Sequence, residues 1–376
     1  MPPPLTNIRK IKSVTSARMD TKKDKKVFVA MSGGVDSSLA AALLKEDGYE
    51  VTGVFIKVWQ PEFLECTWIV EREDAMRVCA LLDIPFLTFD FEEEYKRDVV
   101  DYMVTEYRAG RTPNPDVMCN ARIKFGAFYE KAIAMGADYI ATGHYARRIF
   151  SDLFRLLTAK DMNKDQTYFL WTLKQDVLSH TLFPIGEYEK PNVRERAEKF
   201  GLPTAKKKDS QGLCFIGKLN MKDFLKRFIP EKRGDVLDIN GTVIGNHDGA
   251  MFYTLGERHG FTLTKQTSFE KPHYIVAKDI EHNTITVSTD PIVKEEEKDK
   301  HAIHLLNVHW IAEAPKKGET LQARSRYRQK LFDCILRSTE GDTASVTFSF
   351  TQPITPNGQS LVFYRGEECL GGGVIQ

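Results

Sequence analysis

The sequence predicts an α/β protein, with a domain built on a parallel sheet followed by a small β-rich domain and a C-terminal β-barrel. Three observations predict this architecture. A strand-then-helix rhythm begins at residue 27, short alternating apolar runs replace it after about residue 221, and a charged run at 294–300 separates two such regions. At 376 residues the chain exceeds the size at which one core usually keeps growing, so two or three domains are expected.

The strand-then-helix rhythm is typical of a parallel sheet wrapped by helices. Expected strands cover 27–31, 49–59, 85–91 and 137–146, and expected helices cover 37–47, 70–83, a segment ending near Ala109, and 121–136. Later runs at 235–249 and 272–290 carry turn signals and suit antiparallel strands. Runs at 301–311, 319–328, 333–339, 343–350 and 359–366 suit a closing barrel or sandwich.

Four segments follow from these patterns. They are a basic arm at 1–26, the parallel-sheet domain at 27–220, a central β-rich domain at 221–293 and a C-terminal barrel at 301–376. The arm has three successive prolines, eight Lys or Arg against two Asp, and no apolar periodicity, so it predicts a mobile tail. A transit peptide is the alternative, which the two aspartates and the excess of Lys over Arg disfavour.

Composition limits the function classes. A net charge of +1 means that any nucleic-acid contact must come from local patches. No run of residues is apolar and long enough to cross a bilayer, and the amino terminus lacks the apolar core of a secretory signal, so a cytoplasmic location without membrane partners is expected. Six cysteines without a C-x-x-C pair disfavour a disulfide scaffold and zinc or iron–sulfur ligation, so no cysteine metal site is expected.

Residues 32–38 read S-G-G-V-D-S-S and lie between the first expected strand and the first expected helix. Two glycines let the backbone approach a ligand closely, and a helix amino terminus offers unpaired N–H groups to an anion. The serine hydroxyls add donors, so the segment predicts a phosphate-binding loop. It is not a Walker A loop, because the G-K-[ST] ending is absent. The alternative is a serine-capped helix after a glycine turn.

Two further segments each present a cysteine in an expected loop. T-P-N-P-D-V-M-C-N at 112–120 has prolines that are expected to stiffen an exposed segment and position Asp116 and Cys119. K-D-S-Q-G-L-C-F-I-G at 208–217 follows lysines that are expected to favour the thiolate of Cys214. Two such cysteines suggest redox chemistry, although sequence spacing does not bring them together, and each alone also fits a small buried apolar residue.

The S-G-G-V-D-S loop resembles that of the ATP pyrophosphatases, the PP-loop superfamily, which split ATP into AMP and pyrophosphate while adenylating a substrate. Several activities share this loop, so it cannot choose among them. With both cysteine segments and three more motifs, the chain resembles the tRNA-specific 2-thiouridylases over about residues 27–376. The three motifs are T-G-H-Y-A-R at 142–147, K-D-Q-T-Y-F-L at 164–170 and C-L-G-G-G at 369–373. The resemblance implies a Rossmann-like domain of the adenine nucleotide alpha hydrolase type and a tRNA-binding barrel.

The resemblance also implies three groups of site residues. ATP would bind at Ala30, Met31, Ser32, Gly33, Gly34, Val35, Asp36, Ser37, Ile56 and Gly143. The catalytic residues would be Cys119 as nucleophile, Cys214 as persulfide carrier and Asp116 as acid or base. The target base and tRNA would meet Asn114, Pro115, Asp116, His144, Lys164, Asp165, Gln166, Arg326, Tyr327 and Gln359.

The implied activity is that of a tRNA-uridine 2-sulfurtransferase. ATP, with Mg²⁺, would adenylate the 2-oxygen of a flipped-out wobble uridine, and persulfide sulfur from Cys214 would attack the 2-carbon, directly or as sulfide released by Cys119. A transient Cys119–Cys214 disulfide would result and be reduced in the cytoplasm. The implied partners are tRNAs of the Lys, Glu and Gln type and a persulfide donor, such as a cysteine desulfurase or sulfur relay protein.

Several roles stay open in the sequence. Asp36 suits either a magnesium ligand or a loop carboxylate that accepts backbone N–H bonds, and His144 suits either an RNA contact or a structural histidine. Residues 322–330 are expected to form a strand with Arg324 and the alternate basic side chains after it on one face and Tyr327 on the other. That face suits phosphate, whereas the alternative is a charged edge that prevents aggregation.

Three rival functions share parts of this pattern. An amide-forming ATP pyrophosphatase of small metabolites would need an ammonia source, and no amino-terminal cysteine or glutaminase segment is recognisable. A non-catalytic RNA-binding protein would not need the intact loop and cysteine segments. A thiolase with an iron–sulfur cluster is disfavoured by the missing C-x-x-C pair.

Overall fold

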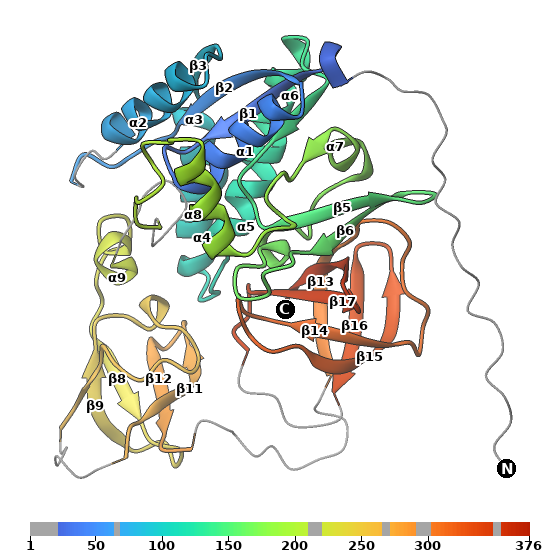
Figure 1. Ribbon diagram of the computed structural model, residues 1–376. Helices are drawn as coiled ribbons and strands as arrows, with labels where there is room; N and C mark the ends of the chain where they lie inside the picture. The colour runs from blue at the N-terminus through green and yellow to red at the C-terminus, as the bar shows by residue number, and fades with distance from the viewer. Residues whose placement is uncertain (1–21, 64–67, 210–219, 265–270, 291–301, 349–354) are drawn as a thin grey trace, which may run out of the picture.

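The computed structural model describes residues 22–63, 68–209, 220–264, 271–290, 302–348 and 355–376. A parallel sheet with its helices lies above two β structures, one coloured yellow and the other orange to red in Figure 1. Three features predicted from the sequence lie outside the described residues: most of the basic arm, the charged run at 294–300, and Cys214.

The first sheet contains five parallel strands in the order β3-β2-β1-β4-β7. They are β1 (Lys26–Met31), β2 (Glu50–Lys57), β3 (Phe86–Asp90), β4 (Tyr139–Ala141) and β7 (Thr181–Leu182). Alternate residues of β1 enter different apolar clusters, since Val27 and Val29 lie in one and Phe28 lies in the other. Both faces of the sheet are therefore buried, which explains the nearly continuous apolar runs. The predicted parallel-sheet domain is confirmed.

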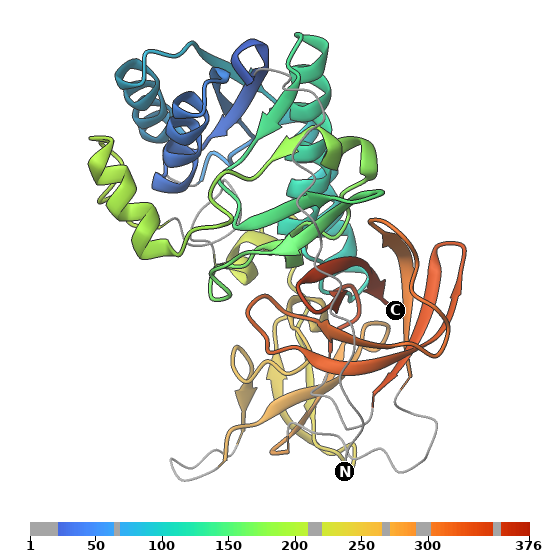
Figure 2. The same ribbon diagram turned by 45° about the vertical axis from the view of Figure 1, so that its right-hand side comes forward.

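Helices surround this sheet in both views (Figures 1 and 2). The α-helices are α1 (Val35–Glu46), α2 (Trp68–Leu81), α3 (Glu92–Tyr95), α4 (Tyr102–Arg108), α5 (Pro115–Met118), α6 (Phe128–Ala134), α7 (Gln175–Ser179) and α8 (Lys190–Lys199). The 3₁₀-helices are η1 (Lys22–Asp24) and η4 (Thr167–Phe169), and the π-helices are η2 (Lys96–Asp101) and η3 (Cys119–Ala127). In the described part of the chain, no helix is long and apolar enough to span a membrane.

The helix expected at 121–136 begins earlier than the sequence suggested. Asn114 caps α5 by accepting a hydrogen bond from the Val117 N–H at 3.2 Å, and α5, η3 and α6 then follow one another without a break. Pro115 stands at the first turn, where a missing N–H costs nothing. The prediction of an exposed loop around Cys119 is therefore wrong, because the cysteine is helical and fully buried.

The central domain is a five-stranded sheet in the order β10-β9-β8-β12-β11, in which β8 and β12 pair in parallel and the other neighbours are antiparallel. Its strands are β8 (Gly234–Leu237), β9 (Val243–His247), β10 (Thr262–Leu263), β11 (Tyr274–Asp279) and β12 (Thr284–Ser288). Helix α9 (Met221–Leu225) precedes the sheet, and η5 (Ala250–Phe252) follows β9. The predicted β-rich central domain is confirmed.

The C-terminal domain is a closed antiparallel barrel. Its strands are β13 (Ala302–Trp310), β14 (Thr320–Arg324), β15 (Phe332–Glu340), β16 (Thr343–Phe348), β17 (Ser360–Arg365) and β18 (Glu368–Ile375). They follow the order β13-β16-β15-β14-β17-β18, and a β13–β18 pairing closes the ring. The predicted barrel is confirmed, and closure leaves fewer open strand edges.

A hairpin from the first domain extends the barrel sheet. Strands β5 (Ala146–Phe150) and β6 (Phe154–Thr158) pair with each other, and Leu156 of β6 pairs with Cys369 of β18. The single strand expected at 137–146 is therefore wrong, because β4 and β5 belong to different sheets. The chain turns between them where Gly143 packs against the start of α1.

Candidate active site

The glycine-rich loop joins β1 to α1 at the carboxyl edge of the parallel sheet, the edge where such sheets bind ligands. Gly34 is the N-cap of α1 and has no side chain to satisfy the N–H groups of the first turn. The hydroxyls of Ser37 and Ser38 donate to the Gly34 carbonyl, at 3.2 and 2.8 Å. They shape the loop, and the unfilled N–H groups of the first turn suit a phosphate.

Two glycines of this site have no room for a side chain. Gly33 has φ +67°, and a Cβ there would lie 2.3 Å from the Glu71 carbonyl oxygen. A Cβ on Gly143 would lie 2.6 Å from the Ser37 nitrogen. The structure therefore brings Gly143 to the loop, although more than 100 residues separate them in sequence.

Ala30, Met31 and Ile56 lie near the loop at the ends of β1 and β2. Ala30 pairs with Val54 and Met31 with Phe55, which places Ile56 one residue beyond the end of that register. Met31 and Ile56 are each 2% exposed, whereas Ala30 is partly exposed. These apolar side chains make the carboxyl edge of the sheet a suitable place for a flat, uncharged ring.

Asp36 is held by two side chains from distant parts of the domain. Its Oδ1 accepts from the Tyr145 hydroxyl at 2.9 Å, and Lys190 Nζ lies 2.8 Å from each carboxylate oxygen. These side-chain contacts differ from the acceptance of backbone N–H bonds that was one expected role, and the magnesium-ligand role stays a prediction. Sequence reasoning missed Lys190, because it lies 154 residues from Asp36 and no local motif marks it.

Lys190 also contacts Asp209, which several cations surround. Lys190, Lys164 and Arg194 each place a nitrogen 2.7 to 2.8 Å from an Asp209 carboxylate oxygen. Partial burial alone would raise the pKa of Asp209, but the hydrogen bonds from Lys164 and Lys190 outweigh it and lower the pKa to about 2. Asp209 is therefore ionised at neutral pH. Through Lys190, which also pairs with Asp36, it is connected to the phosphate loop.

Asp116 lies in α5, and Cys119 follows its last residue and begins η3. Asn114, Pro115 and Asp116 are partly exposed, whereas Cys119 is 0% exposed. Pro113 is buried, so the expectation of an exposed proline-stiffened segment is wrong for this residue. Cys214 lies outside the described residues.

His144 lies in the interior of the first domain. Its Nδ1 is 2.8 Å from the Thr142 hydroxyl, and its ring packs against Phe125 with centroids 5.8 Å apart. Burial, with a smaller contribution from Lys124, holds the pKa of His144 well below its usual range. The imidazole is therefore neutral and faces protein groups in this structure.

Lys164, Asp165 and Gln166 follow the β5–β6 hairpin and face different neighbours. Lys164 binds Asp209, whereas the Gln166 side-chain oxygen accepts from the Tyr145 N–H at 2.9 Å. Asp165 is 1% exposed and forms an ion pair with Arg324 of the barrel, which is 3% exposed. Asp165 therefore joins two domains in this structure.

The predicted strand at 322–330 is wrong in its second half. Strand β14 ends at Arg324, and Arg324 points into the protein toward Asp165 instead of sharing an exposed face. Arg328 has φ +62°, which breaks strand geometry. The Tyr327 ring packs against that of Phe169 with centroids 4.8 Å apart and an interplanar angle of 44°.

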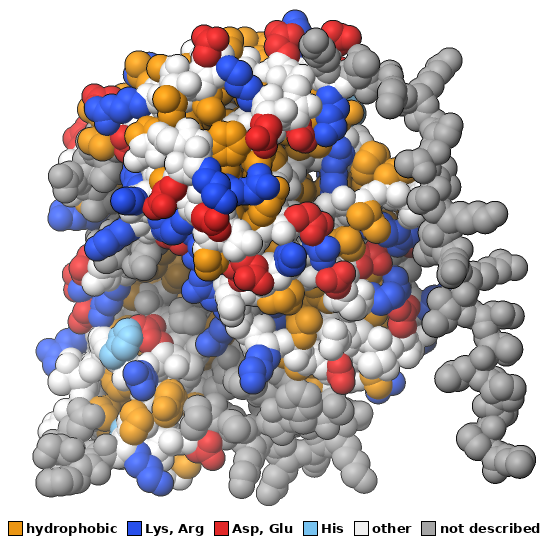
Figure 3. All heavy atoms as spheres, in the orientation of Figure 1, with side chains coloured by type: hydrophobic (Ala, Val, Ile, Leu, Met, Phe, Trp, Pro, Cys, Tyr) orange, Lys and Arg blue, Asp and Glu red, His pale blue; other side chains and the backbone are white. Residues whose placement is uncertain are grey.

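The three basic residues after β14, Arg326, Arg328 and Lys330, are exposed. A groove of about 510 Å³ lies beside them, lined by Met162, Asn163, Lys164, Arg324, Arg328, Gln329, Lys330 and Leu331. Basic side chains on the face drawn in Figure 3 are interspersed with acidic ones, rather than gathered in one basic surface. The groove is thus a local basic feature, the kind of site that a nucleic-acid contact would need on a chain of net charge +1.

Gln359 lies on the barrel and reaches the segment that leads into α5. Its Nε2 donates to the carbonyls of Thr112 at 2.9 Å and Pro113 at 3.2 Å. The structure therefore places Gln359 beside the Asn114–Asp116 segment, where its side chain binds the protein backbone. Within the described ranges, no cluster of three or more His, Cys, Asp or Glu is arranged to hold a metal.

Three family profiles match the chain in succession. They are the tRNA methyl transferase HUP domain over residues 25–218, the tRNA methyl transferase PRC-barrel domain over 222–289 and the aminomethyltransferase beta-barrel domain over 300–375. Together with the phosphate loop, they define a HUP-domain nucleotide-binding protein that carries two β domains.

Relatives with similarity over almost the whole chain are more specific. The tRNA-specific 2-thiouridylase MnmA of Bacillus subtilis is 46% identical over 362 residues, which cover 94% of this chain and 95% of that protein. The protein of the same name from Shigella boydii is 45% identical, covering 94% and 97%. The chain belongs to the tRNA-specific 2-thiouridylase family.

Similarity to solved structures is weaker. The U34-tRNA thiolase NcsA from Methanococcus maripaludis gives a TM-score of 0.36 at 20% identity, covering 56% of this chain and 69% of that chain. A similarity this low has no bearing on the site.

Proposed function

We propose that this protein is a cytoplasmic tRNA 2-thiouridylase that uses ATP and a cysteine persulfide to convert the wobble uridine of tRNAs of the Lys, Glu and Gln type to 2-thiouridine. The observation that carries the proposal is the 46% identity over 94% of the chain. The geometry alone supports a phosphate-binding loop but does not select the acceptor. The profile descriptions mention methyl transfer, whereas the two cysteine segments suit sulfur chemistry better.

In the first step, the loop holds the phosphates of ATP, with Mg²⁺ balancing their charge. The donors are the N–H groups at Gly33, Gly34, Val35, Asp36 and Ser37. Ala30, Met31 and Ile56 contact adenine, and Gly143 lets the loop close on the nucleotide. The uridine 2-oxygen attacks the α-phosphorus and pyrophosphate leaves, so the oxygen becomes part of an AMP leaving group.

In the second step, the terminal sulfur of the Cys214 persulfide attacks the uridine 2-carbon, and AMP leaves with the former 2-oxygen. Cys119 then attacks the inner sulfur of Cys214, which breaks the sulfur–sulfur bond, leaves sulfur on the uridine and forms a Cys119–Cys214 disulfide. Asp116 acts as acid or base. A persulfide donor protein and a cellular reductant restore Cys214 for the next turnover.

Two kinds of tRNA contact are proposed, one with the flipped base and one with the RNA backbone. Asn114, Pro115 and Asp116 meet the flipped base, because they are partly exposed at the start of α5. The groove beside Lys164 and Arg328, together with Arg326 and Tyr327, binds the RNA backbone. His144, Asp165, Gln166 and Gln359, which the sequence pattern also assigned to tRNA, contact protein groups instead, and Gln359 holds the segment that leads into Asn114.

The test is a thiolation assay with purified protein, ATP, Mg²⁺, cysteine, a cysteine desulfurase and unmodified tRNA, analysed by nucleoside mass spectrometry. We expect 2-thiouridine with the wild type and none with Cys119→Ser or Cys214→Ser. Because neither cysteine takes part in adenylation, both variants should still release pyrophosphate from ATP in a tRNA-dependent manner. Pyrophosphate release that needs a small metabolite instead of tRNA would overturn the proposal.

A further inference from the structure

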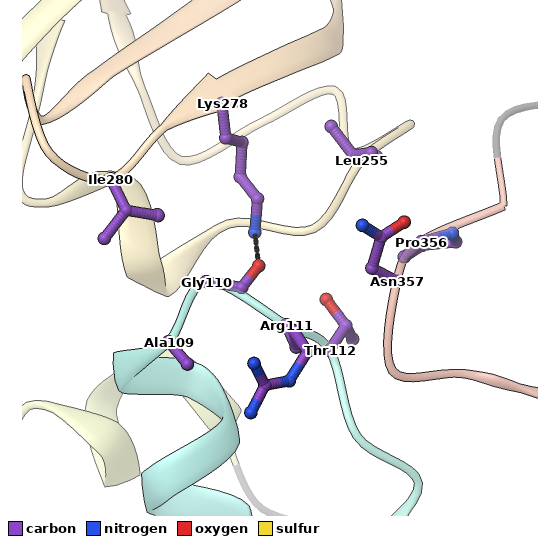
Figure 4. A pocket seen from close by; sticks show the side chains of 9 residues that line it. All are labelled: Ala109, Gly110, Arg111, Thr112, Leu255, Lys278, Ile280, Pro356 and Asn357. Carbon is purple, nitrogen blue, oxygen red and sulfur yellow. Dashed lines mark hydrogen bonds between the residues drawn. The ribbon is translucent and has the colours of Figure 1, made fainter. Parts of the chain in front are cut away.

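The turn between α4 and α5 is held from outside its own domain. Gly110 ends α4 with φ +75°, and its carbonyl accepts a hydrogen bond from Lys278 Nζ of β11 at 2.8 Å (Figure 4). A Cβ on Gly110 would lie 2.4 Å from the Ile280 side chain. The central domain therefore sits directly on this turn.

The barrel holds Thr112 and Pro113 of the same segment. The Thr112 N–H donates to the Asn357 carbonyl at 2.8 Å, and Gln359 Nε2 donates to the carbonyls of Thr112 and Pro113. The Thr112 hydroxyl also lies 3.2 Å from that of Thr254 in the central domain. Three domains thus meet on residues 110–113, around a cavity of about 220 Å³ that Figure 4 shows from nearby.

Lys278 is an unusual residue for such a junction. Its Nζ donates to two neutral carbonyls, those of Gly110 and of Tyr253 at 2.6 Å. Burial lowers the pKa of Lys278 to about 8, although Glu257 opposes this shift. Taking a charged amine out of water costs free energy, which the two hydrogen bonds offset, and removing the amine would leave both carbonyls without this donor. What the lysine provides is a directional bond to the turn.

The held segment leads straight into α5. Pro113 is the last residue before Asn114, whose side chain caps the helix, and α5 is the first turn of the continuous run α5, η3 and α6. A shift of residues 110–113 therefore acts on the first turn of this run, where Asp116 lies, and Cys119 follows directly as the first residue of η3. Displacements of about 1 Å at a catalytic group are enough to slow a reaction about a hundredfold.

We infer that Lys278 of the central domain and Gln359 of the barrel are positioning residues, which align α5 and with it Asp116 and Cys119 for sulfur transfer. This inference rests on the proposed function for the roles of Asp116 and Cys119. It gives the two β domains a part in catalysis that is separate from RNA binding.

The first test compares kinetic constants. Lys278→Met and Gln359→Met remove the donors at similar side-chain size, so we expect kcat for thiolation to fall at least tenfold while KM for ATP stays within twofold. Lys278→Arg keeps a donor and should recover part of kcat. The matched control is Lys222→Met, because Lys222 donates to the Gly260 carbonyl at 2.9 Å within the central domain and does not touch residues 110–113. A fall in kcat that the control shares would overturn the inference.

The second test does not need thiolation. Cys119 is fully buried, so its alkylation by iodoacetamide, followed by peptide mass spectrometry, reports how tightly α5 is held. Alkylation should be at least fivefold faster in Lys278→Met and Gln359→Met than in the wild type and in Lys222→Met. Equal rates would overturn the inference, even in a protein that thiolates no tRNA. If Cys119 is alkylated faster in the two Met variants than in the wild type, but the wild type makes no 2-thiouridine, only the proposed function is overturned.

Discussion

Lys190 Nζ lies 2.8 Å from both carboxylate oxygens of Asp36, in the first turn of α1. The phosphate loop therefore has a cation close to it that comes from the start of α8 and not from a Walker lysine. Lys190 is 9% exposed and Asp209 holds it from the other side, so its ammonium group has little freedom to move.

Replacing Lys190 with Met should raise KM for ATP about tenfold or more, because it removes the cation beside the phosphate loop and leaves the Asp36 carboxylate without this ion pair. A tenfold change corresponds to about 1.4 kcal/mol. Lys190→Arg should keep part of the affinity, since the charge remains. The measurement is the initial rate of pyrophosphate release against ATP concentration. Lys199→Met on the same helix removes an exposed pair with Glu195 and should change KM less than twofold. Equal effects of the two Met substitutions would contradict the prediction.

Gly143→Ala should weaken ATP binding at least tenfold, because the added Cβ would lie 2.6 Å from the Ser37 nitrogen and push the loop out of place. Gly48→Ala is the control, since a Cβ there meets no atom within 4 Å. Gly48 has φ +90°, so this control should cost about 1 kcal/mol of stability and leave ATP affinity unchanged. Isothermal titration calorimetry with ATP measures the affinity of the two variants. An unchanged affinity in Gly143→Ala would show that the loop does not need this close approach.

Arg324→Met should lower the free energy of unfolding by about 3 to 5 kcal/mol, because it leaves the buried carboxylate of Asp165 without its cation. Arg365→Met breaks a more exposed pair with Glu319 and should cost less than about 1 kcal/mol. Urea unfolding followed by tryptophan fluorescence compares the two. The double substitution Arg324→Met with Asp165→Leu should recover much of the loss, and a double variant no more stable than Arg324→Met would argue against an unpaired charge as the cause.

The stability of the wild type relative to Lys278→Met should rise between about pH 8 and 10.5. Burial lowers the pKa of Lys278 to about 8, whereas in the unfolded chain it stays near its ordinary value of 10.5. Between these values the unfolded state binds more protons, so raising the pH favours the folded state, by at most about 3 kcal/mol in total. Urea unfolding at several pH values gives the difference, which should not vary below about pH 7.

For Lys222→Met, the stability of the wild type relative to the variant should change with pH in the opposite direction. Burial works to lower the pKa of Lys222, but hydrogen bonds with Tyr253 and Asp248 outweigh it and raise the pKa. The stabilisation from Lys222 is therefore present at neutral pH and is lost as the pH rises through its folded pKa. The same trend in both comparisons would contradict the assignment for Lys278.

Local patterns predicted the part of the site that is continuous in sequence. The strand, the glycine loop and the helix from Lys26 to Glu46 follow one another directly, so apolar periodicity and loop residue types were sufficient. Lys190 could not be found in this way, because its pairing with Asp36 depends on how α8 packs against α1. The same limit applies to Arg324, whose buried partner Asp165 lies 159 residues away.

Cys119 was misplaced for a different reason. Prolines usually indicate a loop, yet asparagine followed by proline is also a start signal for a helix. Asn114 and Pro115 carry that signal, and Asp116 in the first turn strengthens it. The sequence therefore contained the information, and the competing turn interpretation obscured it.

The pairing of β6 with β18 has a consequence for biosynthesis. Arg155 and Glu368, which form an ion pair at this junction, lie 213 residues apart. While the ribosome is still translating the region between them, β6 has no neighbour to cover its outer edge, and open edges recruit strands from other chains. A truncated mRNA would thus yield a nucleotide-binding domain that is prone to aggregate. The edge of β6 is covered only after β18, the last strand, has been translated.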